Sequence, residues 1–219
     1  MKLTPQLIDV AMPTSPDGAV IVLHGGAARN GRMRVSPTQL SVVRMVPIAR
    51  RIAHAGAGRL AVVRLLNSRR GWDTRHTPVQ DAGWALAQLR QRLGAGVPTC
   101  LVGHSLGGRA ALLAAGAPEV LSAVALAPWV VDSDTPAGIE GKRFLIVHGS
   151  RDRIASPARA ARLARRMEGE ADVRFVVVDG AQHAMLRHHS TFSGLAAQFV
   201  VETLLSGRRG LSPLAAEAS

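Results

Sequence analysis

Ser105 lies in a stretch of sequence that is typical of a nucleophilic serine. The motif Gly-His-Ser-Leu-Gly occupies residues 103–107, between an apolar run at 99–102 and a run of small, helix-forming residues at 109–115. A strand, a sharp turn and a helix in this order expose the serine hydroxyl above the end of a sheet. The two glycines remove side chains that would collide across so tight a turn. The pattern predicts that Ser105 is a nucleophile.

A serine hydroxyl needs a general base, and that base needs a group that orients it. Two later loops can supply these groups. Asp152 follows the apolar run at 144–148, and His183 follows the apolar run at 173–178. Because each of the three residues comes after a different strand, we expect them to meet at one edge of the sheet.

Other acidic and histidine side chains compete for these two roles. Asp132 and Asp134 follow an earlier apolar run and are alternative acids, and His188 and His189 are alternative bases. Four further residues are expected to be structural. His24 and His148 lie at strand ends, His104 lies beside the serine, and Asp179 is expected to form a turn.

Apolar runs alternate with helical patterns along the chain, which predicts an α/β fold: a mainly parallel sheet flanked by helices on both faces. The predicted strands are 7–10, 19–23, 60–66, 99–102, 123–127, 144–148 and 173–178. The predicted helices are 36–54, 77–93, 109–115, 156–167 and 191–205, the first with a kink or a ragged start at Pro47.

The pattern continues without a domain boundary, so we expect one domain over 1–205 and a disordered tail over 206–219. The connection 129–143 is too short to contain a cap domain. No spacing of His, Cys, Asp or Glu suggests a metal site, and no glycine-rich phosphate loop occurs, so the chemistry is expected to need no metal and no cofactor.

With these motifs the chain resembles the α/β-hydrolase superfamily, most closely its small, lidless, esterase-like bacterial members. The resemblance rests on the runs at 24–26, 103–107, 148–152 and 179–183. It implies that Ser105 is the nucleophile, Asp152 the acid and His183 the base. It further implies an oxyanion hole made by backbone N–H groups, one from Leu106 and a second from Gly26 or Ala27.

The chain is strongly basic, with a net charge of +12 and 27 Lys and Arg residues, of which only Lys2 and Lys142 are lysines. Nucleic acid is not an expected partner, because the arginines do not gather in one basic tail. Several lie on loops at the predicted catalytic edge, where they would form a positive rim that attracts an anionic substrate: Arg29, Arg69, Arg70, Arg151 and Arg187, with Arg32, Arg34, Arg75 and Arg153 nearby.

The N-terminal residues, the length of the apolar runs and the cysteine content indicate the cellular location. The first residues lack the apolar stretch of a signal peptide, no run is long enough to span a membrane, and Cys100 is the only cysteine. A cytoplasmic location is the expectation.

Two classes of function fit these residues. The first is hydrolysis of a small carboxylic ester or thioester through an acyl-serine intermediate, with acyl transfer to another acceptor as a variant. The second is a basic, non-catalytic binding or regulatory protein on a hydrolase scaffold. The oligomeric state and the identity of the substrate stay open.

Overall fold

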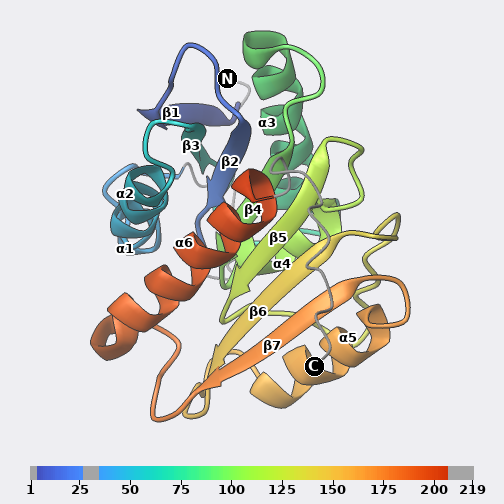
Figure 1. Cartoon of the computed structure of the whole chain (residues 1–219). Coiled ribbons are helices and arrows are strands. Elements are labelled where there is room, and N and C mark those ends of the chain that lie inside the picture. The colour runs from blue at the N-terminus through green and yellow to red at the C-terminus, as the bar shows by residue number, and fades with distance from the viewer. Residues whose placement is uncertain (1–3, 27–34, 207–219) are drawn as a thin grey trace, which may run out of the picture.

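The computed structural model describes residues 4–26 and 35–206, and it contains a seven-stranded sheet with the order β1-β3-β2-β4-β5-β6-β7 (Figure 1). The edge strand β1 is antiparallel to β3, and every other pairing is parallel. The strands are β1 (Gln6–Ala11), β2 (Gly18–Leu23), β3 (Leu60–Leu66), β4 (Thr99–His104), β5 (Val120–Leu126), β6 (Arg143–Gly149) and β7 (Asp172–Val178).

The helices cover both faces of the sheet, as the alternating pattern predicts. Ile48 of α2 and Phe192 of α6 are buried on one face, and Leu86 of α3, Ala110 of α4 and Leu163 of α5 are buried on the other. The helices are α1 (Leu40–Val43), α2 (Met45–Ala55), α3 (Thr77–Leu93), α4 (Leu106–Ala114), α5 (Pro157–Met167) and α6 (His189–Leu205), with a 3-10 turn η1 (Leu186–His188).

Burial follows each strand's position in the sheet. Every residue of β2 and β4 is buried, because these central strands have neighbours on both sides and helices on both faces. The edge strand β7 alternates between half-buried and exposed residues along most of its length. Both central strands are near-continuous apolar runs in the sequence, which is why their positions could be predicted.

The helix expected at 36–54 begins later and is divided. It starts at Leu40 and breaks at Arg44 into α1 and α2. Pro47 lies in the first turn of α2 and has no N–H to donate to the carbonyl of Val43 four residues earlier, so one continuous helix would lose a hydrogen bond at this point. The predicted ragged start at Pro47 therefore agrees with the structure, and Arg44 occupies the break.

The segment between β5 and β6 contains no helix and no strand. A cap domain is therefore absent from this connection, as predicted from its length. Within the described part of the chain no helix is long and apolar enough to cross a membrane. Residues 207–219 of the predicted tail lie outside the described residues, so the tail stays a prediction.

Candidate active site

Ser105 forms the sharp turn between β4 and α4. Its φ of 57° and ψ of −120° are unfavourable for a residue with a side chain, and such conformations concentrate at functional sites. A Cβ on Gly103 would overlap the carbonyl oxygen of Gly107, and a Cβ on Gly107 would lie 2.6 Å from the carbonyl oxygen of His24. Only glycine fits at these two positions, so the motif is required for the turn itself.

The structure brings Ser105, His183 and Asp152 into one hydrogen-bonded chain. The Ser105 hydroxyl lies 2.9 Å from His183 Nε2, and His183 Nδ1 lies 2.8 Å from Asp152 Oδ2. A carboxylate only accepts, so Nδ1 carries the proton, and Nε2 of the neutral ring is free to accept the serine proton. This geometry matches that of a nucleophile, a general base and an orienting acid.

The Asp152 carboxylate is buried, and four donors surround it. Besides His183, its Oδ2 lies 3.2 Å from His148 Nε2, and its Oδ1 accepts from the backbone N–H groups of Ile154 at 2.8 Å and Ala155 at 2.9 Å. Burial would raise the pKa of Asp152, but hydrogen bonds from His148, His183 and the two N–H groups outweigh it, and the pKa lies well below the usual range. Asp152 therefore stays ionised beside His183.

The alternative acids bind other partners. The exposed Asp132 pairs with Arg162 at 2.8 Å. Asp134 is buried in a two-pronged ion pair with Arg109, with N–O distances of 2.7 to 3.1 Å. Asp179 accepts from Ser150 Oγ at 2.9 Å in the turn before His183.

His183, rather than His188 or His189, is the histidine that contacts Ser105. The other two belong to η1 and to the first residue of α6. His183, the histidine nearest the end of β7, therefore contacts the serine. His188 and His189 lie outside the hydrogen-bonded group.

Two buried histidines, His24 and His148, hold the surrounding loops. His24 donates from Nδ1 to the carbonyl of Gly25 and accepts at Nε2 from the N–H of Asn67 at 3.2 Å, which joins the loops after β2 and β3. His148 Nε2 lies 3.1 Å from the carbonyl oxygen of Ala155. The structural roles predicted for these histidines agree with the contacts, but the sequence did not reveal that His148 also contacts Asp152.

His104 contacts the loop of His183 directly. Its Nε2 donates to the carbonyl oxygen of His183 at 2.9 Å, and the two rings lie 5.0 Å apart. Burial, with further contributions from His183 and Arg44, lowers the pKa of His104 to about 3, so the ring is neutral. His104 thus fixes the backbone of His183, a role that its place in the motif did not indicate.

A cavity of about 400 Å³ opens above Ser105, within the size range of small-molecule sites. Its lining includes Leu106, whose N–H begins α4 beside the serine, and Gly26. Both were predicted to form the oxyanion hole. Ala27, the alternative to Gly26, lies outside the described residues, so the choice between them stays open.

The rim of arginines at the carboxyl edge of the sheet stays a prediction. Six of the nine lie in the described part of the chain but not in the lining of the cavity: Arg69, Arg70, Arg75, Arg151, Arg153 and Arg187. Arg29, Arg32 and Arg34 lie outside the described residues. The lining instead includes Arg44, at the break between α1 and α2. The helical pattern around Pro47 signalled the break, but not the direction of this side chain.

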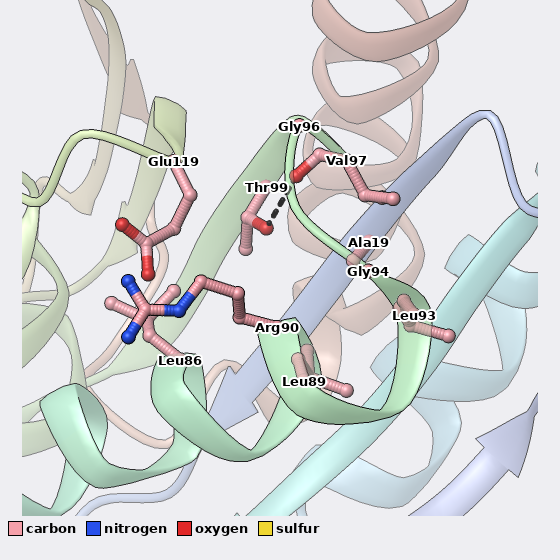
Figure 2. Close-up of a pocket in the computed structure, with 10 residues that line it drawn as sticks. All are labelled: Ala19, Leu86, Leu89, Arg90, Leu93, Gly94, Gly96, Val97, Thr99 and Glu119. Carbon is pink, nitrogen blue, oxygen red and sulfur yellow. Dashed lines mark hydrogen bonds between the residues drawn. The ribbon is translucent and has the colours of Figure 1, made fainter.

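A much smaller pocket, of about 30 Å³, lies at the opposite end of the sheet (Figure 2). Over residues 4–26 and 35–206 no group of three His, Cys, Asp or Glu side chains is placed to bind a metal ion.

No protein-family model and no curated protein sequence matches the chain, whereas many solved structures do. An alpha-beta serine hydrolase homologue from Coxiella burnetii has a TM-score of 0.68 and 18% identity over 90% of this chain and 91% of its own. A serine hydrolase without a lid from Xanthomonas campestris has a TM-score of 0.67 and 17% identity over 94% and 97%. A thermophilic esterase from Thermogutta terrifontis has a TM-score of 0.67 and 18% identity over 90% and 87%.

At these identities the similarity establishes the fold. The chain has the α/β-hydrolase fold, and residues 4–26 and 35–206 contain no cap domain, which confirms the predicted fold class and the resemblance noted in the sequence.

Proposed function

We propose that the protein is a serine hydrolase that cleaves a small carboxylic ester or thioester. One observation carries the proposal: the hydrogen-bonded chain from Ser105 through His183 to Asp152, at 2.9 and 2.8 Å, on the wall of an open cavity. A binding protein without activity has no need for this chain or for the strained backbone of Ser105.

The reaction begins when His183 Nε2 takes the proton of Ser105 and Oγ attacks the substrate carbonyl carbon. The oxyanion that forms faces the N–H of Leu106, with the positive end of the α4 dipole beside it. A second donor comes from Gly26 or Ala27. The intermediate collapses, the bond to the leaving alcohol or thiol breaks, and His183 gives that group its proton.

Hydrolysis of the acyl-enzyme repeats these steps with water. His183 removes a proton from water, the hydroxide attacks the acyl carbon, and the proton returns to Ser105 as the carboxylic acid leaves. Asp152 holds the imidazole in the useful tautomer and stabilises its positive charge. His104 is a positioning residue, since its bond goes to the backbone of His183 and not to the reacting atoms.

Covalent labelling with a fluorophosphonate probe tests the proposal. The Thermogutta terrifontis esterase is described as phosphoramylated by tabun, which supports the choice of an organophosphorus reagent. We expect labelling of the wild type and of Ser150→Ala, a nearby serine that bonds Asp179, and none of Ser105→Ala. Labelling of Ser105→Ala, or a folded wild type that neither reacts nor cleaves esters, would refute the proposal.

A substrate panel then separates ester from thioester cleavage. Ser105→Ala and His183→Ala are each expected to lower kcat by about 10⁶-fold on any substrate of the panel, because the nucleophile and the base act as a unit. Esters and thioesters of equal acyl length show which leaving group is preferred, and product analysis with an added alcohol shows whether the acyl group goes to water or to another acceptor.

A further inference from the structure

Arg44 is a charged residue in the wall of the cavity that contains Ser105. It joins α1 to α2, and Ser41, three residues earlier on the same side of this helical segment, also lines the cavity. The rest of the lining consists of glycine, apolar and aromatic residues, the two histidines and Ser105 itself, with no acidic side chain among them. Among the described residues, the lining therefore includes one arginine and no acidic side chain.

The Arg44 guanidinium has no partner in the described part of the chain. Its Nε is buried and makes no hydrogen bond, and burial lowers the pKa of Arg44. Arg109, four residues after Ser105, is by contrast paired with Asp134, and its guanidinium lies 4.0 Å from the centre of the Trp72 ring. Residues 27–34, which lie outside the described residues, contain no aspartate or glutamate.

An arginine stays charged even when it is partly desolvated, and a desolvated charge without a partner is unfavourable. An anion in the cavity would remove this cost. The Ser41 hydroxyl accepts from Gln39 Nε2 at 2.6 Å, so its own proton is free to be donated. A guanidinium and a hydroxyl donor that line the same cavity, three residues apart on one helical segment, suit a carboxylate, whose two oxygens can accept from both.

We propose that Arg44 and Ser41 bind a carboxylate of the substrate, so that the ester or thioester cleaved at Ser105 is an anionic one. This inference rests on the proposed function and specifies its substrate class. Arg44 acts as a specificity-determining residue, because it contacts a part of the substrate away from the reacting carbonyl. A single guanidinium fits a singly charged carboxylate better than a phosphate dianion, which takes more donors.

Two matched pairs of esters test this. The first pair is the mono-nitrophenyl ester of adipate and the nitrophenyl ester of hexanoate, which have acyl chains of equal length. The second places the carboxylate on the leaving group: carboxyphenyl acetate against phenyl acetate. For each pair we take the ratio of kcat/KM for the anionic ester to kcat/KM for the neutral ester. For at least one pair, we expect Arg44→Gln to lower this ratio by about ten- to a hundredfold, mainly by raising the KM of the anionic ester.

The control is Arg50→Gln, which removes the same charge from an exposed position on α2. It should leave both ratios as in the wild type, because any long-range steering by net charge changes equally in the two variants. Arg44→Lys should give an intermediate ratio, since it keeps the charge but not the planar pair of donors. If Arg44→Gln leaves both ratios unchanged, or if Arg50→Gln lowers them equally, the carboxylate site is refuted.

A binding measurement separates this inference from the proposed function. Calorimetric titration of monomethyl adipate into Ser105→Ala needs no turnover. If monomethyl adipate binds Ser105→Ala at least tenfold more tightly than it binds the double variant Ser105→Ala, Arg44→Gln, the result supports the carboxylate site. This holds even if the wild type cleaves no ester. Equal binding to the two variants overturns the site, even if ester cleavage depends on Ser105.

Discussion

Backbone hydrogen bonds join neighbouring segments at both ends of the sheet, but the two ends differ in the side chains that are added to these bonds. At the amino ends, backbone groups of one loop bind backbone groups of the next: the N–H of Ala19 donates to Pro98 at 2.9 Å, and that of Thr99 donates to Glu119 at 2.8 Å. At the carboxyl ends such backbone bonds also occur, for example from the N–H of Ala127 to Val147 at 2.7 Å, and the buried histidines His24, His104 and His148 add side-chain bonds.

The cavities at the two ends also differ, both in volume and in the side chains that line them. The pocket at the amino end, about 30 Å³, is large enough for about one water molecule and is walled by apolar residues of α3. Its two charged residues lie at the rim, where Figure 2 shows the Arg90 guanidinium directed toward the Glu119 carboxylate. The cavity at the carboxyl end, about 400 Å³, contains Ser105, His183 and Arg44. Parallel α/β sheets place ligands at the carboxyl ends, and here the choice of side chains gives that end its chemistry.

After Ser105→Ala and His183→Ala, Asp152→Asn should have the largest effect on activity, and it acts at the carboxyl end of the sheet. An amide cannot stabilise the imidazolium and favours the wrong tautomer of His183, so we expect kcat to fall by about 10⁴-fold on an activated ester. The matched control is Asp132→Asn, an exposed carboxylate from the loop after β5, which should stay close to wild type. A nearly active Asp152→Asn would remove Asp152 from its proposed role.

Asp134→Asn is expected to affect stability instead of chemistry. Its side chain is 3% exposed and that of Arg109 7%, so the substitution leaves a buried guanidinium without its counter-ion. Breaking such a pair costs about 3–5 kcal/mol, which chemical denaturation would measure as a loss in the free energy of unfolding. The fraction that remains folded should label with the fluorophosphonate as the wild type does, and failure to label would assign Asp134 to the site.

Acid pH should weaken the contribution of Asp152 to stability. The pKa of Asp152 is depressed in the folded protein, so the unfolded chain takes up the proton first as the pH falls below about 4. The free energy of unfolding of the wild type, relative to that of Asp152→Asn, is therefore greatest near neutral pH and decreases in acid. Denaturation of both proteins at pH 7 and pH 3 checks this, and an unchanged difference would contradict it.

The sequence predicted the parts of the molecule that depend on local pattern. Buried strands appear as apolar runs, and Ser105, Asp152 and His183 each follow one of these runs. A parallel sheet places the carboxyl ends of its strands at one edge, which brings the three residues together. Arg44 was missed because its position depends on how α1 and α2 pack against the sheet. The second contact of His148 was missed for a related reason, since burial beside Asp152 depends on the fold of the loop 150–155. The rim of arginines was predicted from loop position alone, and it stays a prediction.

Arg90→Gln should have the smallest effect of all. Arg90 lines the pocket at the amino end as Arg44 lines the cavity at the carboxyl end, and the same substitution removes the same charge. Arg90 is exposed and its pocket is too small for a substrate, so we expect a change in the free energy of unfolding within about 0.5 kcal/mol. The kcat/KM ratio of the adipate and hexanoate esters should also match that of the wild type. If Arg90→Gln lowers this ratio as much as Arg44→Gln does, overall charge sets the preference for anions, and the two ends of the sheet do not differ in this respect.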